Sequence, residues 1–412
     1  MKIAFVSQAW NFVGLSERNN SIVIWLEEMA RALARNHEVL VYSRGGRGIP
    51  PRAEDQGIHH RRFRTGIERR WHDLIQGLSR AGRDPVFARP SFYRHYLRRI
   101  AADLRREKPD LVHVMNFGQF LPSLRRSLPA ARLVLHMHCE WLSTLPRRLV
   151  APWLESADLV LFCSEYLRQR AIQAWPEAAP KFHCVPNGVD MDLFRAVEPR
   201  TTIAPRLLFV GRISPEKGVH DLLQAMQLVL ERHPAAKLQL VGPLGLPSAH
   251  FLDSLGPPEV VDRLRPLWNP NYPKRIRDHI AELGIDSVEL PGPEPHRALP
   301  RILANADLLV NPSHSESFGM SLIEALAVGR RVVATRVGGQ IEILEGCPLG
   351  TLVSPAWPEE LGRGILRALA GPPCSPEERQ TVRERIAECY SWPSVRDQLL
   401  AAYATLPGPT RK

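Results

Sequence analysis

The stretch Leu207-Leu208-Phe209-Val210-Gly211-Arg212-Ile213-Ser214-Pro215-Glu216-Lys217-Gly218 begins as a short apolar run and continues as a polar turn bounded by glycines. The apolar run is typical of a β-strand, and the residues after the turn, 220–230, have the apolar spacing of a helix. A strand, a turn and a helix in this order form the unit from which parallel sheets are built. The stretch therefore predicts a parallel α/β domain whose functional residues follow the strands.

Comparable strand–turn–helix units recur in two series along the 412 residues. Apolar runs of the first series lie at 3–6, 39–42, 111–114, 133–135 and 159–162, with helix-like segments such as 22–33 between them. Those of the second series lie at 207–210, 238–241, 288–290, 308–310 and 332–334. This pattern predicts two doubly wound parallel sheets, with a ligand-binding cleft between the carboxyl ends of their strands.

Prolines and a loss of periodicity set the expected domain boundaries. Residues 195–205 contain Pro199 and Pro205 and have no clear period, so we expect a linker at 196–205 between a first domain, 1–195, and a second domain, 206–388. The proline-rich segment 243–273 is expected to leave the second domain as a loop. Residues 392–406, which begin beside Pro393, predict a terminal helix within a last segment, 389–412.

The composition is that of a globular protein, with 44% apolar and 24% charged residues. No apolar run approaches the roughly 20 residues that span a bilayer, and the polar residues that soon follow residues 3–6 do not fit a signal peptide. The six cysteines include no Cys-x-x-Cys pair, which is simplest to explain by reduced thiols in a cytoplasmic protein.

Most of the net charge of +11 comes from one part of the chain. Sixteen arginines and six acidic residues lie between Arg44 and Arg106, a local balance of +10. Such a stretch can attract nucleic acid, an anionic membrane surface or an acidic substrate. It can equally be a solvated face with no partner.

Two groups of residues carry candidate chemistry. Arg212 and Lys217 flank one turn, so both cations can converge on one anion, and a diphosphate suits this combination of a planar fork and a compact charge. The second group, after the run 308–310, contains Glu316 and Glu324, two carboxylates able to accept hydroxyls of a sugar ring and a ribose. Backbone amides of Phe318, Gly319 and Met320 would point at a ligand at the start of the next helix. The alternatives are two surface cations and a capped helix with a surface glutamate.

The two groups together, in this order, resemble the retaining nucleotide-sugar glycosyltransferases of family 4, which have the GT-B fold of two Rossmann-like domains facing a central cleft. Further resemblance lies in 157–160, 164–167, Pro186-Asn187-Gly188-Val189-Asp190 with Phe194, and Gly338-Gly339 with Glu342. Trp392 and the helix after it resemble the family's terminal segment, which returns to the first domain. The resemblance covers nearly the whole chain.

The resemblance implies roles for these residues. Arg212 and Lys217 would neutralise the donor diphosphate, Glu316 would bind hydroxyls of the transferred sugar, and Glu324 would bind the ribose. Gly211, Phe318, Gly319 and Met320 would line the donor site, and the loop with Pro293 would seat the base. His138 would face the donor sugar, with His136 as the alternative and a buried structural histidine as the other explanation. Gly14 stands where relatives have paired glycines, in the loop 11–16.

The mechanism expected from this resemblance needs neither a metal nor a cofactor. Asp190-Met191-Asp192 resembles a metal-binding Asp-x-Asp string, but it falls in the Asn-Gly-Val-Asp segment and is interpreted as structural. His136, His138 and Cys139 have no second ligand pair at zinc-site spacing. The donor is expected to be a nucleotide-diphosphate sugar, transferred with retention of the anomeric configuration.

The acceptor is expected to be a glycan or a lipid-linked molecule, in glycan, glycolipid or cell-surface polysaccharide synthesis. Arginines 94, 98, 99, 105 and 106 alternate with apolar residues 92, 93, 96, 97 and 100, a pattern that fits a basic amphipathic helix on an anionic membrane. The protein is thus expected to be cytoplasmic, with peripheral contact at the inner membrane face and no nucleic-acid partner. The alternatives are a nucleotide-sugar epimerase, glycosylation of a soluble natural product, and a non-catalytic binding protein on the same fold.

Overall fold

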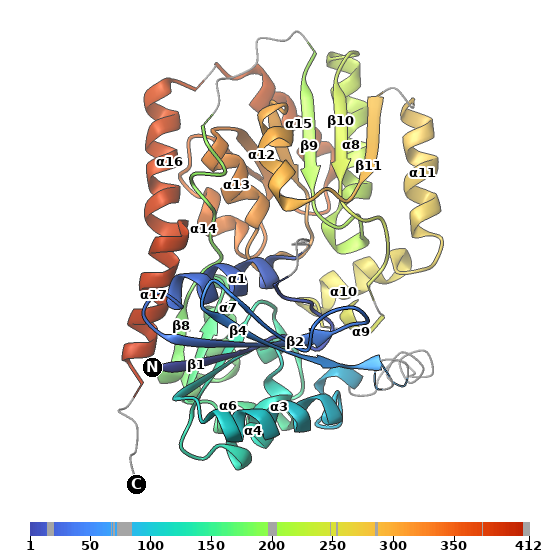
Figure 1. Cartoon of the computed structure of the whole chain (residues 1–412). Coiled ribbons are helices and arrows are strands. Elements are labelled where there is room, and N and C mark those ends of the chain that lie inside the picture. Colours follow the sequence, from blue (N-terminus) through green and yellow to red (C-terminus); the bar gives the residue numbers. More distant parts are fainter. Residues whose placement is uncertain are drawn as a thin grey trace. The chain divides into compact units, whose positions relative to one another are not determined.

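The computed structural model describes residues 1–14, 20–66, 68, 71, 85–196, 204–247, 249–252, 254–284, 287–372 and 374–406. The chain divides into two compact units, Met1–Asn187 with Val395–Lys412, and Gly188–Ser394 (Figure 1). We call them unit 1 and unit 2. Residues 197–203 of the expected linker lie outside the described part of the chain, so that linker stays a prediction.

Unit 1 is built on an eight-stranded sheet in the order β3-β4-β2-β1-β5-β6-β7-β8. Every neighbouring pair is parallel except β3 with β4, which is antiparallel at one edge. The strands are β1 (Lys2–Val6), β2 (Glu38–Gly45), β3 (Arg52–Asp55), β4 (Ile58–Arg64), β5 (Leu111–Met115), β6 (Arg132–Met137), β7 (Leu159–Phe162) and β8 (Phe182–Cys184). The five predicted strands of the first series are present and form most of the sheet.

Helices connect these strands as the parallel crossovers require. They are α1 (Ser21–Leu33), α3 (Arg94–Glu107), α4 (Leu121–Ser127), α5 (Trp141–Thr144), α6 (Arg147–Ser156) and α7 (Glu165–Ala174). Helix α1 begins directly after Asn20, which caps it: the side chain of Asn20 accepts a hydrogen bond from the amide of Val23 at 3.0 Å. Its buried face includes Trp25 and Leu26, both fully covered.

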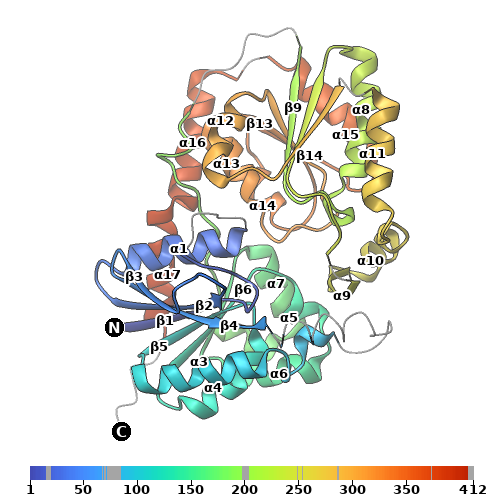
Figure 2. The same ribbon diagram turned by 45° about the vertical axis from the view of Figure 1, so that its right-hand side comes forward.

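Unit 2 is built on a six-stranded, wholly parallel sheet in the order β11-β10-β9-β12-β13-β14. The strands are β9 (Arg206–Val210), β10 (Lys237–Val241), β11 (Val288–Gly292), β12 (Leu308–Asn311), β13 (Arg331–Thr335) and β14 (Gly350–Val353). Helices α8 (Val219–Arg232), α11 (Tyr272–Leu283) and α15 (Pro358–Ala370) lie together on one side of this sheet, and α12 (Leu299–Ala304) and α13 (Met320–Val328) lie on the other (Figure 2). Both units are therefore doubly wound, and the predicted fold class is confirmed.

The core of unit 2 fixes the two strands that carry the candidate site. Leu207 and Phe209 of β9, Leu308 and Val310 of β12, and Leu222 of α8 belong to one cluster of buried apolar side chains. Strands β9 and β12 are direct neighbours, with Leu207 opposite Leu308, although β10 and β11 come between them in the chain. The segments that follow β9 and β12 therefore start side by side.

The end of the chain belongs to both units. Helix α16 (Pro376–Tyr390) starts with a complete capping box between Ser375 and Glu378. Helix α17 (Trp392–Ala404) begins in unit 2 and continues from Val395 as part of unit 1. There the hydroxyl of Tyr403 lies 2.6 Å from Nδ1 of His113 on β5.

Two sequence-based expectations are wrong. The proline-rich segment 243–273 is not a loop throughout, since it contains α9 (Ala249–Leu252) and α10 (Pro258–Leu264), whose Leu252 and Leu264 form a small buried cluster. The apolar residues of the arginine-rich helix do not form a membrane-facing surface. Phe92, Tyr93, Tyr96, Leu97 and Ile100 are buried in unit 1, because α3 packs on its own sheet.

The arginine-rich stretch between Arg44 and Arg106 has two structural contexts. Part of it forms β3 and β4, where Arg61 pairs with Glu107 at 3.2 Å. Part forms α3, whose Arg94, Arg98 and Arg105 are exposed. Residues 67, 69–70 and 72–84 of the stretch lie outside the described residues. Among the helices that the structure describes, none has the length and hydrophobicity to cross a bilayer.

Candidate active site

The turn after β9 places Arg212 at the end of the strand and holds it there. Nη2 of Arg212 donates to Oε1 of Glu216 at 2.9 Å, and Nε donates to Oγ of Ser214 at 3.2 Å. Ser214 also donates to Glu216 Oε1, at 2.7 Å. The Glu216 side chain is only 1% exposed whereas that of Arg212 is 40% exposed, so a buried carboxylate orients a cation that solvent and ligands can still reach.

Lys217 and Glu316 meet across the two segments. Nζ of Lys217 lies 2.8 Å from Oε2 of Glu316, with side-chain exposures of 21% and 16%. Lys217 ends the 3-10 turn η4 (Pro215–Lys217) after β9, and Glu316 lies in the loop after β12. The structure thus joins the two residue groups that the sequence analysis singled out.

Two glycines allow this close approach of backbones. A Cβ on Gly218, whose φ is +66°, would lie 2.0 Å from the carbonyl oxygen of Pro312. A Cβ on Gly338, whose φ is +52°, would lie 1.7 Å from the carbonyl oxygen of Glu316. The amide of Gly339 donates to that same oxygen at 3.1 Å. The turn at Gly338 and Gly339 therefore holds the backbone of Glu316, and the turn at Gly218 packs against the same loop at Pro312; a larger residue at Gly218 or Gly338 would disrupt this packing.

Helix α13 begins directly after this loop. Its N-cap is Gly319, which offers no side-chain cap, so the first amides of the helix are oriented toward the loop without a capping side chain. The ring of Phe318 is buried against Tyr390 of α16, with centroids 5.5 Å apart. Phe318 therefore has only its backbone to offer a ligand, while the side chain of Met320 is half-buried.

Glu324 on α13 is almost fully buried and has a partner that sequence reasoning missed. Its Oε1 lies 2.7 Å from Nε2 of His296, which belongs to the 3-10 turn η7 (His296–Ala298) after β11. The same loop contains Pro293, which is exposed directly after the end of β11. A ribose hydroxyl at Glu324 would have to share the carboxylate with His296.

In unit 1, three histidines cluster on the neighbouring strands β5 and β6: His113 lies in the middle of β5, His136 near the end of β6, and His138 directly after β6. His136 and His138 have ring centroids 4.3 Å apart, and those of His113 and His136 are 5.3 Å apart. Burial lowers the pKa of both His113 and His138 to about 3, and it lowers the pKa of His136 well below its ordinary value. All three rings are therefore neutral near pH 7.

The hydrogen bonds distinguish His136 from His138. Nε2 of His136 lies 3.2 Å from the carbonyl oxygen of Val185. His138 is fixed through its backbone, whose amide donates to Oδ1 of Asn116 at 2.6 Å. Asn187 lies beside the His138 ring, but neither ring nitrogen has a well-formed hydrogen bond in the described part of the chain.

Gly14 lies beside a cavity in unit 1. The Gly14 amide donates to Oε1 of Glu27 at 2.8 Å, so this donor already has a partner. The cavity has a volume of about 300 Å³ and is lined by Gly14, Glu27, Arg31, Asp55 and His60 among others. Ligand sites commonly start at this size. Residues 15–19, which include Ser16 of the expected loop, lie outside the described residues.

Some site residues were not predicted. Glu216 stands four residues after Arg212 in the same turn, which is the one sequence signal that could have found it. His296 lies 28 positions before Glu324, and nothing in the local pattern connects the two.

Two Rossmann-like units, with a cation pair and a carboxylate at adjacent strand ends, define the class of GT-B enzymes that bind nucleotide-linked substrates. Residues 22–193 match the model described as Glycosyltransferase Family 4, and residues 190–388 match that described as Glycosyl transferases group 1. The chain belongs to the GT-B glycosyltransferases of the family 4 type. It is a transferase that takes its sugar from a nucleotide-sugar donor, and this assignment favours transfer over epimerisation.

Relatives agree with this assignment over nearly the whole chain. The lipopolysaccharide 1,2-N-acetylglucosaminetransferase of Salmonella typhimurium is 25% identical over 391 residues, 91% of each chain. Among solved structures, sucrose-phosphate synthase from Thermosynechococcus elongatus has a TM-score of 0.75 at 21% identity, covering 98% of this chain and 99% of that one. Anabaena HepE in complex with UDP-glucose has a TM-score of 0.70 at 19% identity, covering 98% and 100%. The two structures support the fold.

Proposed function

We propose that this protein is a retaining, metal-independent glycosyltransferase that moves a sugar from a nucleoside-diphosphate donor to a hydroxyl of a glycan or lipid-linked acceptor. The observation that carries the proposal is the contact between Lys217 and Glu316, with Arg212 held one turn away by Glu216. The arrangement brings two cations and one carboxylate to the ends of two adjacent strands.

Charge on the leaving group is the main problem of the reaction. When the bond from the anomeric carbon to the phosphate oxygen breaks, the diphosphate gains negative charge, and fixed cations stabilise that change without reorganising. Arg212 can bind two phosphate oxygens through its planar fork, and Lys217 adds a compact charge. These two side chains take the part that a divalent metal would otherwise have.

The carboxylates orient the donor. Glu316 accepts hydroxyls of the transferred sugar, and because it also contacts Lys217, sugar and diphosphate are positioned by one ion pair. Glu324 accepts the ribose hydroxyls in competition with His296. The first amides of α13, from Phe318 to Met320, contact sugar or phosphate, and the loop of Pro293 seats the base.

His138 faces the donor sugar from unit 1. Support comes from its ring nitrogens, which lack the internal hydrogen bond that His136 makes with Val185. A neutral imidazole can donate one hydrogen bond and accept another, as a sugar hydroxyl requires. Retention follows if the acceptor hydroxyl attacks on the face that the diphosphate leaves and passes its proton to the departing phosphate.

Unit 1 binds the acceptor in this proposal, with the cavity beside Gly14 as a candidate subsite. The product belongs to glycan, glycolipid or cell-surface polysaccharide synthesis, on the cytoplasmic side of the membrane. Contact with an anionic membrane would be electrostatic, through the exposed arginines of α3, because the apolar face of that helix is buried.

The test is a thermal-shift screen of the full chain against UDP-, GDP- and ADP-sugars with EDTA present, since a ligand that binds only the folded state raises its stability. We expect one base class to stabilise the protein and to support transfer to an acceptor with the chelator present. The anomeric configuration of the first product, determined by NMR, tests retention. A strict requirement for an added divalent ion, or an inverted product, would contradict the proposal.

A further inference from the structure

Three side chains that the proposed reaction does not use form a buried group. They come from the same two segments of the chain as Lys217 and Glu316. His220 and Asp221 lie in the first turn of α8, three and four residues after Lys217. His314 lies in the loop after β12, two residues before Glu316. The three side chains are 7%, 12% and 2% exposed. They therefore connect the two segments from the inside.

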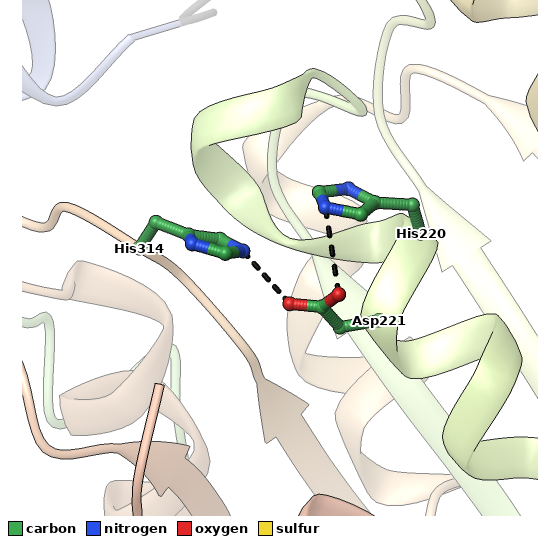
Figure 3. A group of neighbouring side chains, drawn as sticks. All are labelled: His220, Asp221 and His314. Carbon is green, nitrogen blue, oxygen red and sulfur yellow. Dashed lines mark hydrogen bonds and ion pairs between the residues drawn. The ribbon is translucent and has the colours of Figure 1, made fainter. Parts of the chain in front are cut away.

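The geometry of this group is that of a small ligand set. Nε2 of His314 lies 2.8 Å from Oδ2 of Asp221, and Nε2 of His220 lies 3.5 Å from Oδ1 of the same carboxylate. Figure 3 shows both rings directed at the Asp221 carboxylate from different elements. The rings are nearly parallel, with an interplanar angle of 13°. One potential donor atom from each residue lies within 4.8 Å of the others.

We propose that His220, Asp221 and His314 bind a divalent transition-metal ion, with zinc as the best match. Two imidazoles and a carboxylate form a donor set that binds zinc in preference to magnesium or calcium. With bonds of about 2.0 Å, donor atoms around a tetrahedral zinc ion are about 3.3 Å apart. The distances to the two oxygens of Asp221, 2.8 and 3.5 Å, lie on either side of that value, and one donor atom of each residue lies within 4.8 Å of the others, so the side chains have to move closer together to enclose the ion.

A neighbouring tyrosine supports the role of His220 as a ligand. Nδ1 of His220 lies 3.3 Å from the hydroxyl of Tyr272, which is buried at the start of α11. A histidine that binds metal through one nitrogen commonly makes a hydrogen bond through the other, which fixes the orientation of the ring. Tyr272 supplies that bond and leaves Nε2 of His220 for the ion.

The ion would be structural. Its ligands are shielded from solvent, and it would cross-link the start of α8 to the loop before α13. Lys217 and Glu316 come from these same two segments, so the ion would stabilise the frame of the donor site without contacting the diphosphate. The inference does not depend on the proposed function, because a zinc site can exist whatever the donor is.

The experiment uses the untagged full chain, stripped with a chelator and titrated with zinc against a chromophoric competitor. We expect one equivalent of tightly bound zinc, a rise in Tm on adding zinc, and the absorption bands of tetrahedral cobalt after substitution. His220→Gln and His314→Gln should each lower zinc affinity by more than about tenfold, because loss of even an outer hydrogen-bond partner of a ligand costs about 10- to 100-fold. The matched control is His59→Gln, a partly exposed histidine on β4 of unit 1 whose Nδ1 lies 3.5 Å from Glu54.

Several outcomes would overturn the proposal. Absence of zinc binding to the wild type at micromolar concentrations would mean that Asp221 and His314 form a hydrogen-bonded pair and nothing more. Equal affinity in His314→Gln and wild type would place the metal elsewhere. Asp221→Asn keeps the side-chain volume and serves if a histidine variant fails to fold. Nucleotide-sugar binding, measured in parallel on zinc-loaded and stripped samples, separates the two proposals: failure of zinc to bind with nucleotide-sugar binding intact overturns only this site, and absence of nucleotide-sugar binding in both samples overturns only the proposed function.

Discussion

At the scale of single residues, the donor site depends on the partners with which its charged side chains form ion pairs and hydrogen bonds. The sequence predicted Arg212, Lys217, Glu316 and Glu324 as candidates, but it did not predict their partners. Lys217 and Glu316 are 99 positions apart, and they meet because β9 pairs with β10 on one side and with β12, which comes much later in the chain, on the other. Strand order is decided by packing of the whole sheet, so no local pattern could reveal this pair.

The first prediction concerns Lys217. Lys217→Ala should lower kcat by about 10²-fold or more on the donor found in the screen, because removal of a fixed electrostatic stabiliser has costs of this size. Release of nucleoside diphosphate under saturating donor measures the loss.

The matched control for this prediction is Lys274→Ala on α11, an exposed lysine whose Nζ lies 2.7 Å from Oδ2 of Asp278. The control should keep wild-type turnover. Turnover of a folded Lys217→Ala variant within twofold of wild type would remove Lys217 from the mechanism.

At the scale of elements, glycine turns set how closely loops approach. Gly218→Ala would strain a left-handed turn and also push a methyl group into the carbonyl of Pro312. Gly346→Ala is the matched control in the same unit, because its φ of +67° is nearly that of Gly218 and no atom lies within 4 Å of the added Cβ. The left-handed conformation alone costs roughly 1–2 kcal/mol.

We therefore expect Gly346→Ala to lower the free energy of unfolding by about that amount, and Gly218→Ala to lower it by clearly more. Denaturant unfolding of both variants measures the difference. Equal losses would mean that the close contact between the turn of Gly218 and Pro312 relaxes without cost.

The same scale explains where prediction from sequence failed. The strands with uniform apolar runs were all found, whereas β4, Ile-His-His-Arg-Arg-Phe-Arg, was missed because its buried positions hold His60 and Arg62. Helix α3 was found to be amphipathic, but amphipathicity does not reveal whether the apolar face packs on the protein or on a membrane. In this protein it packs on the sheet, since Tyr96, Ile100 and Leu104 have no exposed surface.

A prediction about α3 follows from its exposed arginines. If they attract an anionic surface, wild type should bind vesicles containing phosphatidylserine at low salt, and binding should fall at high salt because exposed charges are screened. The double variant Arg98→Glu, Arg105→Glu should bind at least tenfold more weakly, since each basic residue near such a surface contributes about 1 kcal/mol.

Flotation of the protein with vesicles measures this binding. Arg363→Glu on α15 changes an exposed arginine of the other unit and should have little effect. Binding that survives high salt, or that both variants reduce equally, would contradict a role for α3.

At the scale of the whole molecule, the two units differ in their buried histidines. In unit 1, burial lowers the pKa of His60 to about 4 and that of His113 and His138 to about 3, and it lowers the pKa of His136 as well. In unit 2, burial lowers the pKa of His220 to about 4. Most of the groups that resist protonation in the folded state therefore belong to unit 1.

This difference predicts that acid unfolds unit 1 before unit 2. A histidine with a folded pKa below its unfolded value of about 6.5 binds fewer protons when folded, so its contribution to stability is complete above pH 6.5 and is lost as pH falls toward the folded pKa. Each such histidine changes the slope of stability by up to about 1.4 kcal/mol per pH unit within that window. Carboxylates with a lowered pKa, such as Glu107, affect stability only below about pH 4.5, so the loss of stability between pH 6.5 and 4.5 comes from the histidines.

Hydrogen exchange followed by mass spectrometry, at pH 7 and pH 5 with correction for intrinsic rates, should show protection falling in β1, β5 and β6 while β9 and β12 keep theirs. Earlier loss of protection in β9 and β12, or simultaneous loss in both sheets, would show that other groups determine the acid stability of this protein.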